Sequence, residues 1–188
     1  MNYFDEDTHA KDYIHMSRKY DGSALIPHLR KHLPDASTVL ELGMGPGKDL
    51  DLLSKHYSAT GSDSSVAFLD IYRETHHSAN LLLLDAATLD TERTFDGIFS
   101  NKVLIHLTQE EIRSSFQRQA KILKPGGIAF HSFWRGDKEE VFDGLRFTYM
   151  EPETLLPLID SQFEVLETQI YKESKKEDSF LIILRLRS

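Results

Sequence analysis

Short apolar segments alternate with amphipathic segments along the middle of the chain. The apolar segments have the length of β-strands and lie at residues 38–42, 58–63, 80–86, 95–101 and 128–133. Between them, apolar side chains recur every three or four positions, as on one face of a helix, at residues 47–56, 64–77 and 107–123. This alternation predicts an α/β fold with a mostly parallel sheet and helices on both faces. Segment 80–86 is apolar almost throughout, which predicts a strand covered on both faces.

The segment 107–123 carries the strongest helix signals. Thr108 and Glu111 have the spacing of a capping box, in which each side chain bonds the backbone N–H of the other residue. Apolar side chains from Ile112 to Leu123 would line one face of this helix. The following Lys-Pro-Gly-Gly, residues 124–127, predicts a turn into the next strand.

The N-terminal part of the chain differs from this middle. It holds a polar segment with several tyrosines, then residues 24–33, which predict a helix. Pro27 fits there only within the first helical turn, where no intrahelical N–H is lost.

The C-terminal part predicts a loop, a short helix and two strands. We expect a mixed loop from Trp134 to about residue 151 and a helix at 152–159. Segments 163–171 and 179–186 predict strands, and the short connection between them implies antiparallel pairing. The connection, residues 172–178, is highly charged, and we expect it to be a solvated turn.

Composition narrows the class of protein. The 188 residues suit a single domain, and no apolar run approaches the roughly 20 residues that span a bilayer. The start of the chain does not have the pattern of a signal peptide, so we expect a cytoplasmic protein without a membrane partner. The formal net charge is −8, which argues against nucleic-acid binding and favours a small, neutral or cationic partner. Without cysteine or an H-E-x-x-H motif, no metal site is expected.

Three glycines at alternate positions follow the first predicted strand. Gly43, Gly45 and Gly47 miss the dinucleotide fingerprint G-x-G-x-x-G by one residue, because its third glycine would fall at Lys48. Glu41 lies two residues before the first glycine. A carboxylate there would repel a pyrophosphate and attract a cation, so the pattern favours a nucleoside with a positive, amino-acid-like tail.

At these residues the sequence resembles the class I S-adenosylmethionine-dependent methyltransferases. Their first motif, acid-x-Gly-x-Gly-x-Gly, is matched from Glu41 to Gly47, and the resemblance runs from about Val39 to Phe130. Asp63 ends the second strand 22 residues after Glu41, where the family's acid holds the ribose. Segment 123–130 resembles the family's turn into strand five. The implied fold is a three-layer sandwich with a seven-stranded sheet, order 3-2-1-4-5-7-6, strand seven antiparallel.

The resemblance implies S-adenosyl-L-methionine as cofactor and S-adenosyl-L-homocysteine as product. With Tyr20 added as a candidate lid residue, the predicted cofactor site comprises Glu41, Gly43, Gly45, Gly47, Asp63, Ser64, Asp85, Ala86, Ser100, Asn101 and Tyr20.

The acceptor side is predicted from position alone. Trp134, Arg135 and Tyr149 are candidate substrate-binding residues, and Trp134 is alternatively a core residue. His106 is the candidate general base, with a backbone-bonded histidine at a helix start as its alternative role. Tyr13 is, like Tyr20, either a lid residue or a helix-packing residue.

We therefore predict methyl transfer to a small-molecule acceptor by a monomer or homodimer that binds neither nucleic acid nor membrane. The expected organisation is one domain over 1–188, with a helical lead or lid at 1–38, a cofactor-binding core at 39–134, and an acceptor-side loop, helix and hairpin at 135–188. Two alternatives stay open: an S-adenosylmethionine-binding regulator or partner subunit without catalysis, and a nicotinamide-dependent oxidoreductase.

Overall fold

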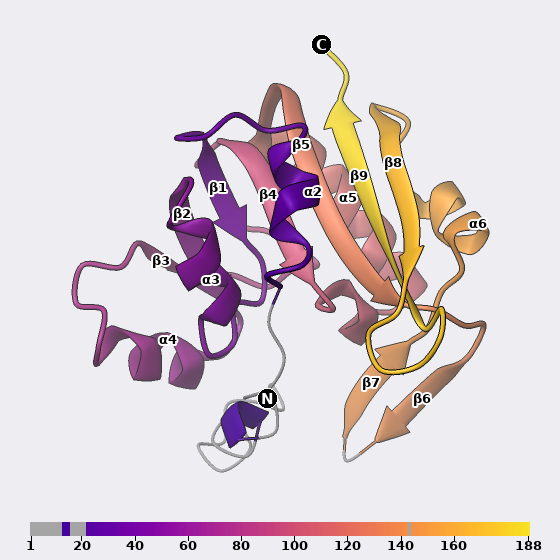
Figure 1. Cartoon of the computed structure of the whole chain (residues 1–188), viewed down its shortest axis with the longest axis horizontal. Helices are drawn as coiled ribbons and strands as arrows, with labels where there is room; N and C mark the ends of the chain where they lie inside the picture. Colours follow the sequence, from indigo (N-terminus) through magenta and orange to yellow (C-terminus); the bar gives the residue numbers. More distant parts are fainter. Residues whose placement is uncertain (1–12, 16–21, 143) are drawn as a thin grey trace.

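The computed structural model describes residues 13–15, 22–142 and 144–188. Its centre is a seven-stranded sheet of order β3-β2-β1-β4-β5-β9-β8 (Figure 1). The strands are β1 (Thr38–Glu41), β2 (Ser58–Asp63), β3 (Leu81–Leu83), β4 (Phe95–Asn101), β5 (Leu123–Trp134), β8 (Phe163–Tyr171) and β9 (Ser179–Leu186). The first five pair in parallel, and β9 runs antiparallel to both β5 and β8. The predicted order is confirmed, since β8 and β9 are the sixth and seventh strands of this sheet along the chain.

Helices cover both faces of the sheet, which confirms the predicted three layers (Figure 1). They are α2 (Ile26–Arg30), α3 (Lys48–Leu53), α4 (Val66–Arg73), α5 (Gln109–Ile122) and α6 (Pro152–Leu155), with 3₁₀ helices η2 (Leu104–His106) and η3 (Leu156–Leu158). Pro27 lies in the first turn of α2, and the capping box of Thr108 and Glu111 begins α5, as predicted.

Alternation along the central strands divides the core into two sides. Ile98 and Ala129 pack in the cluster that includes α5 and η2, whereas the neighbouring Phe99 and Phe130 pack in the cluster that includes α2. The rings of Phe99 and Phe130 stack with centroids 4.9 Å apart. Both sides of β4 and β5 are therefore buried.

Two segments differ from the sequence predictions, and a third agrees with them. The expected loop after Trp134 contains a hairpin, β6 (Glu139–Phe142) paired with β7 (Leu145–Thr148). The third strand is not covered on both faces, because β3 is an edge strand and its Leu83 side chain is 59% exposed. The turn at residues 172–178 is largely exposed, as predicted, and the Asp178 carboxylate accepts three backbone N–H groups within it.

Candidate functional site

The glycine turn lies at the carboxyl end of β1, between that strand and α3 (Figure 1). Gly43, Gly45 and Gly47 all have positive φ, at 59°, 47° and 83°. A Cβ on Gly43 would lie 2.6 Å from Val103, and one on Gly47 would lie 2.2 Å from the Tyr72 ring, so packing within the protein requires both glycines.

Gly45 differs from its two neighbours. A Cβ added there would meet, among the described residues, only the ring edge of Tyr13, at an ordinary contact distance of 3.6 Å. Among the described residues, the Tyr13 ring alone therefore limits the space on this side of the Gly45 Cα. Tyr13 covers this face and packs edge-on against Phe68, with ring centroids 5.8 Å apart.

Asp63 connects the end of β2 to the glycine turn. Its Oδ2 accepts the backbone N–H of Gly45 at 2.9 Å, and its Oδ1 accepts that of Ser65 at 2.9 Å. Burial raises the pKa of the Asp63 carboxyl, and backbone donors, including the N–H of Ser64, oppose that rise. An ionised carboxylate has about four lone-pair positions, so Asp63 retains capacity for a ligand hydroxyl.

Glu41 ends β1 directly beneath the turn and is only 3% exposed. Its Oε2 is buried without a hydrogen-bond partner among the described residues. Burial raises the pKa of this carboxyl well above its ordinary value, and the charges of Asp49, Asp63 and Asp51 raise it further. A buried, unpartnered carboxylate among other acids is a costly arrangement that a cation would relieve.

Asp49 belongs to this site, although in the sequence it is indistinguishable from a helix cap or a solvated acid. Its Oδ1 accepts the backbone N–H of Gly22 at 2.5 Å, and its Oδ2 accepts the Asn101 amide at 2.9 Å. The Asn101 Oδ1 in turn accepts the hydroxyl of Ser132 at 2.6 Å. These partners lie far from residue 49 along the chain, so no local pattern reveals them. Asp49 thereby joins the N-terminal segment, the glycine turn and the ends of β4 and β5.

Three further predicted cofactor residues lie near the site, and one falls outside the described residues. Ser64 follows Asp63 at the site, and Asp85 and Ala86 follow β3 at the same edge of the sheet, where the Asp85 carboxylate accepts the Ala87 N–H. Tyr20 lies outside the described residues.

Ser100 does not present its side chain to the glycine turn. It is fully buried, and its hydroxyl lies 2.7 Å from Nδ1 of His131, whose Nε2 lies 2.9 Å from the Gln119 amide oxygen. Burial lowers the pKa of His131 to about 3, so the ring is neutral. The Ser100 hydroxyl therefore belongs to a buried network between β4, β5 and α5, and the contact of Ser100 with the cofactor stays a prediction from its position after β4.

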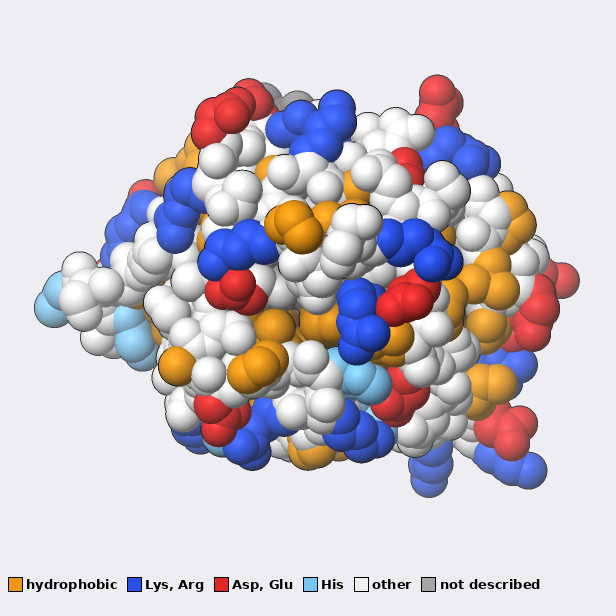
Figure 2. All heavy atoms as spheres, turned by 90° about the horizontal axis from the view of Figure 1, so that it is seen from above, with side chains coloured by type: hydrophobic (Ala, Val, Ile, Leu, Met, Phe, Trp, Pro, Cys, Tyr) orange, Lys and Arg blue, Asp and Glu red, His pale blue; other side chains and the backbone are white. Residues whose placement is uncertain are grey.

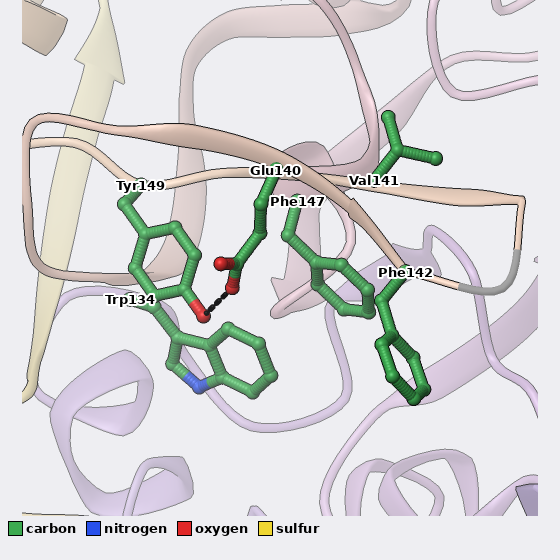
Figure 3. Close-up of a pocket in the computed structure, with 6 residues that line it drawn as sticks. All are labelled: Trp134, Glu140, Val141, Phe142, Phe147 and Tyr149. Atoms are coloured by element: carbon green, nitrogen blue, oxygen red, sulfur yellow. Dashed lines mark hydrogen bonds between the residues drawn. The ribbon is translucent and has the colours of Figure 1, made fainter.

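A pocket of about 310 Å³ lies under the β6–β7 hairpin (Figure 3). Its lining residues are Trp134, Glu140, Val141, Phe142, Phe147 and Tyr149. Two of the three predicted acceptor residues, Trp134 and Tyr149, thus lie in one pocket. Arg135 does not line it, because its guanidinium pairs with Glu151 at 2.8 Å and bonds the carbonyl of Glu177.

His106 anchors the hairpin. Its Nδ1 lies 2.8 Å from the carbonyl oxygen of Arg146, so Nδ1 carries the proton and donates it, and Nε2 holds the lone pair. The ring packs edge-on against Phe147, with centroids 5.1 Å apart. Burial lowers the pKa of His106, which keeps the imidazole neutral at pH 7. The backbone bond is the one expected for the alternative, structural role, and His106 does not line the pocket.

Within residues 13–15, 22–142 and 144–188, no group of three or more His, Asp or Glu side chains has an arrangement that could hold a metal ion. The helices in this part of the chain lack the length and apolar character needed to cross a membrane.

Comparison with known proteins agrees with this geometry. Residues 39–127 match the family model described as a methyltransferase domain. The tRNA (carboxymethyluridine(34)-5-O)-methyltransferase of Mus musculus is 33% identical over 111 residues, 58% of this chain and 16% of that protein. The trans-aconitate 2-methyltransferase of Variovorax paradoxus is 33% identical over 103 residues, 53% of this chain and 39% of that protein. The chain thus spans less than half the length of either relative.

Among solved structures, the N-methyltransferase NodS from Bradyrhizobium japonicum in complex with S-adenosyl-L-homocysteine has a TM-score of 0.70. It is 20% identical, and the match covers 87% of this chain and 85% of that chain. At this identity the likeness is one of fold, and here it agrees with the sheet order, the glycine turn and the family model. Over residues 39–127 the chain is therefore similar to methyltransferase domains, and it shares its fold with this N-methyltransferase.

Proposed function

We propose that this protein transfers the methyl group of S-adenosylmethionine to a small-molecule acceptor. The buried Glu41 carboxylate carries the proposal, because its Oε2 has no partner among the described residues and lies beneath the glycine turn. Together with Asp49 and Asp63, it makes a site that suits a ligand with a cationic, amino-acid-like end. A nicotinamide dinucleotide, which brings a pyrophosphate, would meet repulsion at the same place.

Each part of the ligand has a proposed partner. Glu41 faces the aminoacyl end, the open Cα of Gly45 permits close approach of the turn, and Asp63 accepts from the ribose. Asp85 and Ala86 are the proposed contacts of the adenine, and Tyr13, whose ring lies near Gly45, is the proposed lid residue. When bound, the sulfonium supplies an already activated methyl group. The chain itself then contributes mainly by orienting the acceptor, which can supply about 7–11 kcal/mol of barrier reduction.

The preference for a small acceptor is supported by the pocket and by charge. The pocket of about 310 Å³ is at the lower end of the range for small-molecule sites. The net charge of −8 disfavours a nucleic-acid acceptor. The face opposite the glycine turn, at the amino ends of the parallel strands, mixes Lys and Arg with Asp and Glu (Figure 2). The mouse relative acts on tRNA, so RNA is the second candidate acceptor. Binding to RNA would have to weaken steeply with salt.

Calorimetric titration with S-adenosylmethionine, S-adenosylhomocysteine and NADH tests the proposal. We expect micromolar binding of the first two, equivalent to about −8 kcal/mol, and no binding of NADH. Gly45→Val should abolish the binding while circular dichroism shows a folded protein, because a branched side chain would fill the approach to the turn. Binding of NADH alone would overturn the proposal. Cofactor binding without turnover on any acceptor class would favour a regulator or partner subunit.

His106 does not line the pocket but packs against its lining residue Phe147, and it is proposed as general base only for acceptors that are still protonated at neutral pH. His106→Ala should then slow turnover by about 10²–10⁴-fold with little change in cofactor affinity. Because the base must be neutral and burial lowers its pKa, the rate should fall only as pH drops below the ordinary histidine value of 6.5.

His106→Asn is the matched control, since an asparagine amide can still donate to the Arg146 carbonyl but cannot take a proton. If the asparagine variant retains the wild-type rate while the alanine variant is slow, His106 acts as a hairpin anchor only.

A further inference from the structure

The walls of the pocket under the β6–β7 hairpin are mostly flat rings. Trp134 stacks on Phe147 at an interplanar angle of 16° and a centroid distance of 5.6 Å, and on Tyr149 at 30° and 5.7 Å. Phe142 is 74% exposed, the largest exposure among the large apolar side chains described. Figure 3 shows its ring on the same side of the hairpin as those of Trp134 and Phe147. A flat occupant would gain most here, because offset stacking adds to the burial of apolar surface.

Glu140, the charged residue among the described residues that line the pocket, is already paired, and two further ion pairs lie near the hairpin. Tyr149 also donates its hydroxyl to Glu140 at 2.8 Å, and burial raises the pKa of this phenol to about 12, so it stays a neutral donor. A charged occupant would have to break an existing pair or enter an apolar slot without compensation. The pairs are Lys138–Glu140 at 2.8 Å, Arg146–Glu139 at 2.7 Å and Arg135–Glu151 at 2.8 Å.

The pocket adjoins the proposed cofactor site along β5. Ser132 donates to Asn101, which bonds Asp49 beside the glycine turn. Trp134 lies two residues further along the same strand, about 7 Å away at roughly 3.3 Å per residue. A ring held against Trp134 would therefore lie within one small molecule's length of Ser132 and Asn101, which connect to the glycine turn through Asp49.

We propose that the methyl acceptor is an uncharged molecule with a flat aromatic ring, which stacks between Phe142 and the Trp134–Phe147 layer. This inference rests on the proposed function, because it identifies the pocket as the acceptor site. Occupation would also cover the exposed Phe142 ring, which the protein alone leaves in water.

Trp134 is the single tryptophan of the sequence, so its fluorescence reports on this pocket directly. The full chain, first saturated with S-adenosylhomocysteine to fill the cofactor site, is titrated with four probes: p-cresol, tyramine, 4-hydroxyphenylacetate and cyclohexanol. We expect saturable quenching by p-cresol. The cationic, anionic and non-aromatic probes should each bind about tenfold more weakly or worse, a difference of about 1.4 kcal/mol.

Substitutions at the mouth of the pocket test the stacking itself. Phe142→Ala should weaken p-cresol binding about three- to tenfold, and Phe142→Leu should recover only part of that loss, because leucine restores apolar area without a ring face. Ile170→Ala is the control, because it truncates a partly exposed apolar side chain on β8, and it should leave p-cresol binding unchanged.

The inference is overturned if p-cresol gives no saturable change, if cyclohexanol or either charged probe binds as tightly as p-cresol, or if Phe142→Ala has no effect. The initial saturation with S-adenosylhomocysteine is monitored separately by calorimetry. Failure at that step refutes the proposed function, whereas failure at the probe step refutes only the aromatic acceptor.

Discussion

Replacing Glu41 by glutamine is expected to weaken S-adenosylmethionine binding by about 10- to 100-fold while stabilising the protein alone. The loss of affinity follows because a hydrogen bond to a charged group contributes about 1.5–3 kcal/mol, and Glu41 is the proposed partner of the ligand's cationic end. The gain in stability follows because the wild-type carboxyl is buried among Asp49, Asp63 and Asp51 and its Oε2 has no described partner. We expect about 1 kcal/mol, or about 2–4 °C in melting temperature.

The pH dependence of both effects has a definite sign. Burial raises the folded-state pKa of Glu41 above the 4.5 of the unfolded chain, so between these two values the folded protein holds a proton that the unfolded chain releases. This group's stability contribution is therefore fully present below pH 4.5 and is lost as pH rises through the folded pKa. A bound cation lowers that pKa, so binding releases a proton and strengthens with rising pH.

Calorimetry in two buffers of different ionisation enthalpy measures that proton release, and thermal unfolding across pH measures the stability. The glutamine variant should show neither proton release nor the loss of stability attributed to Glu41. The exposed carboxyl of Glu92, in the loop between β3 and β4, provides the control variant Glu92→Gln. Undiminished affinity in Glu41→Gln would remove Glu41 from the ligand site.

Features encoded by neighbouring residues could be predicted from the sequence. The positions of β4, the capping box of α5 and the glycine turn each depend on a few adjacent side chains. The order of the sheet followed from the family resemblance, with the antiparallel last pair also indicated by its short connection.

Features that depend on distant contacts could not be predicted in this way. The partners of Asp49 lie 27 and 52 residues away in sequence, and its own surroundings are those of any acid at a helix start. The buried network of the Ser100 hydroxyl could not be predicted for a related reason. Because β4 is buried on both faces, its sequence does not alternate between apolar and polar, and nothing local says which face each residue occupies.

The β6–β7 hairpin was not predicted because β6 is exposed, whereas β4 is buried. All four residues of β6 are exposed, so the strand needs no apolar face and shows no alternation. Its position is set by contacts with other segments, including the Thr148 hydroxyl on the Leu107 carbonyl and the His106 ring on Phe147. The structure of the hairpin that lines the proposed acceptor pocket is thus the part of the fold that local sequence patterns predict least.

The second large effect is expected at Asp63. Asp63→Ala should reduce cofactor affinity by about 100-fold or more and also lower the free energy of unfolding by about 2 kcal/mol or more. Two backbone donors, the N–H groups of Gly45 and Ser65, would lose their buried acceptor, at about 1–3 kcal/mol each. Loss of affinity alone therefore cannot distinguish a ribose contact from a disturbed glycine turn.

A thermodynamic cycle separates these two roles of Asp63. Wild type and Asp63→Ala are each titrated with S-adenosylhomocysteine and with its 2′,3′-dideoxy analogue, which lacks the ribose hydroxyls. If Asp63 accepts from the ribose, removing the hydroxyls costs the wild type affinity that the variant has already lost, and the coupling exceeds about 0.5 kcal/mol. If the two losses simply add, Asp63 acts only by holding Gly45, and the free lone-pair capacity of its carboxylate has no part in binding.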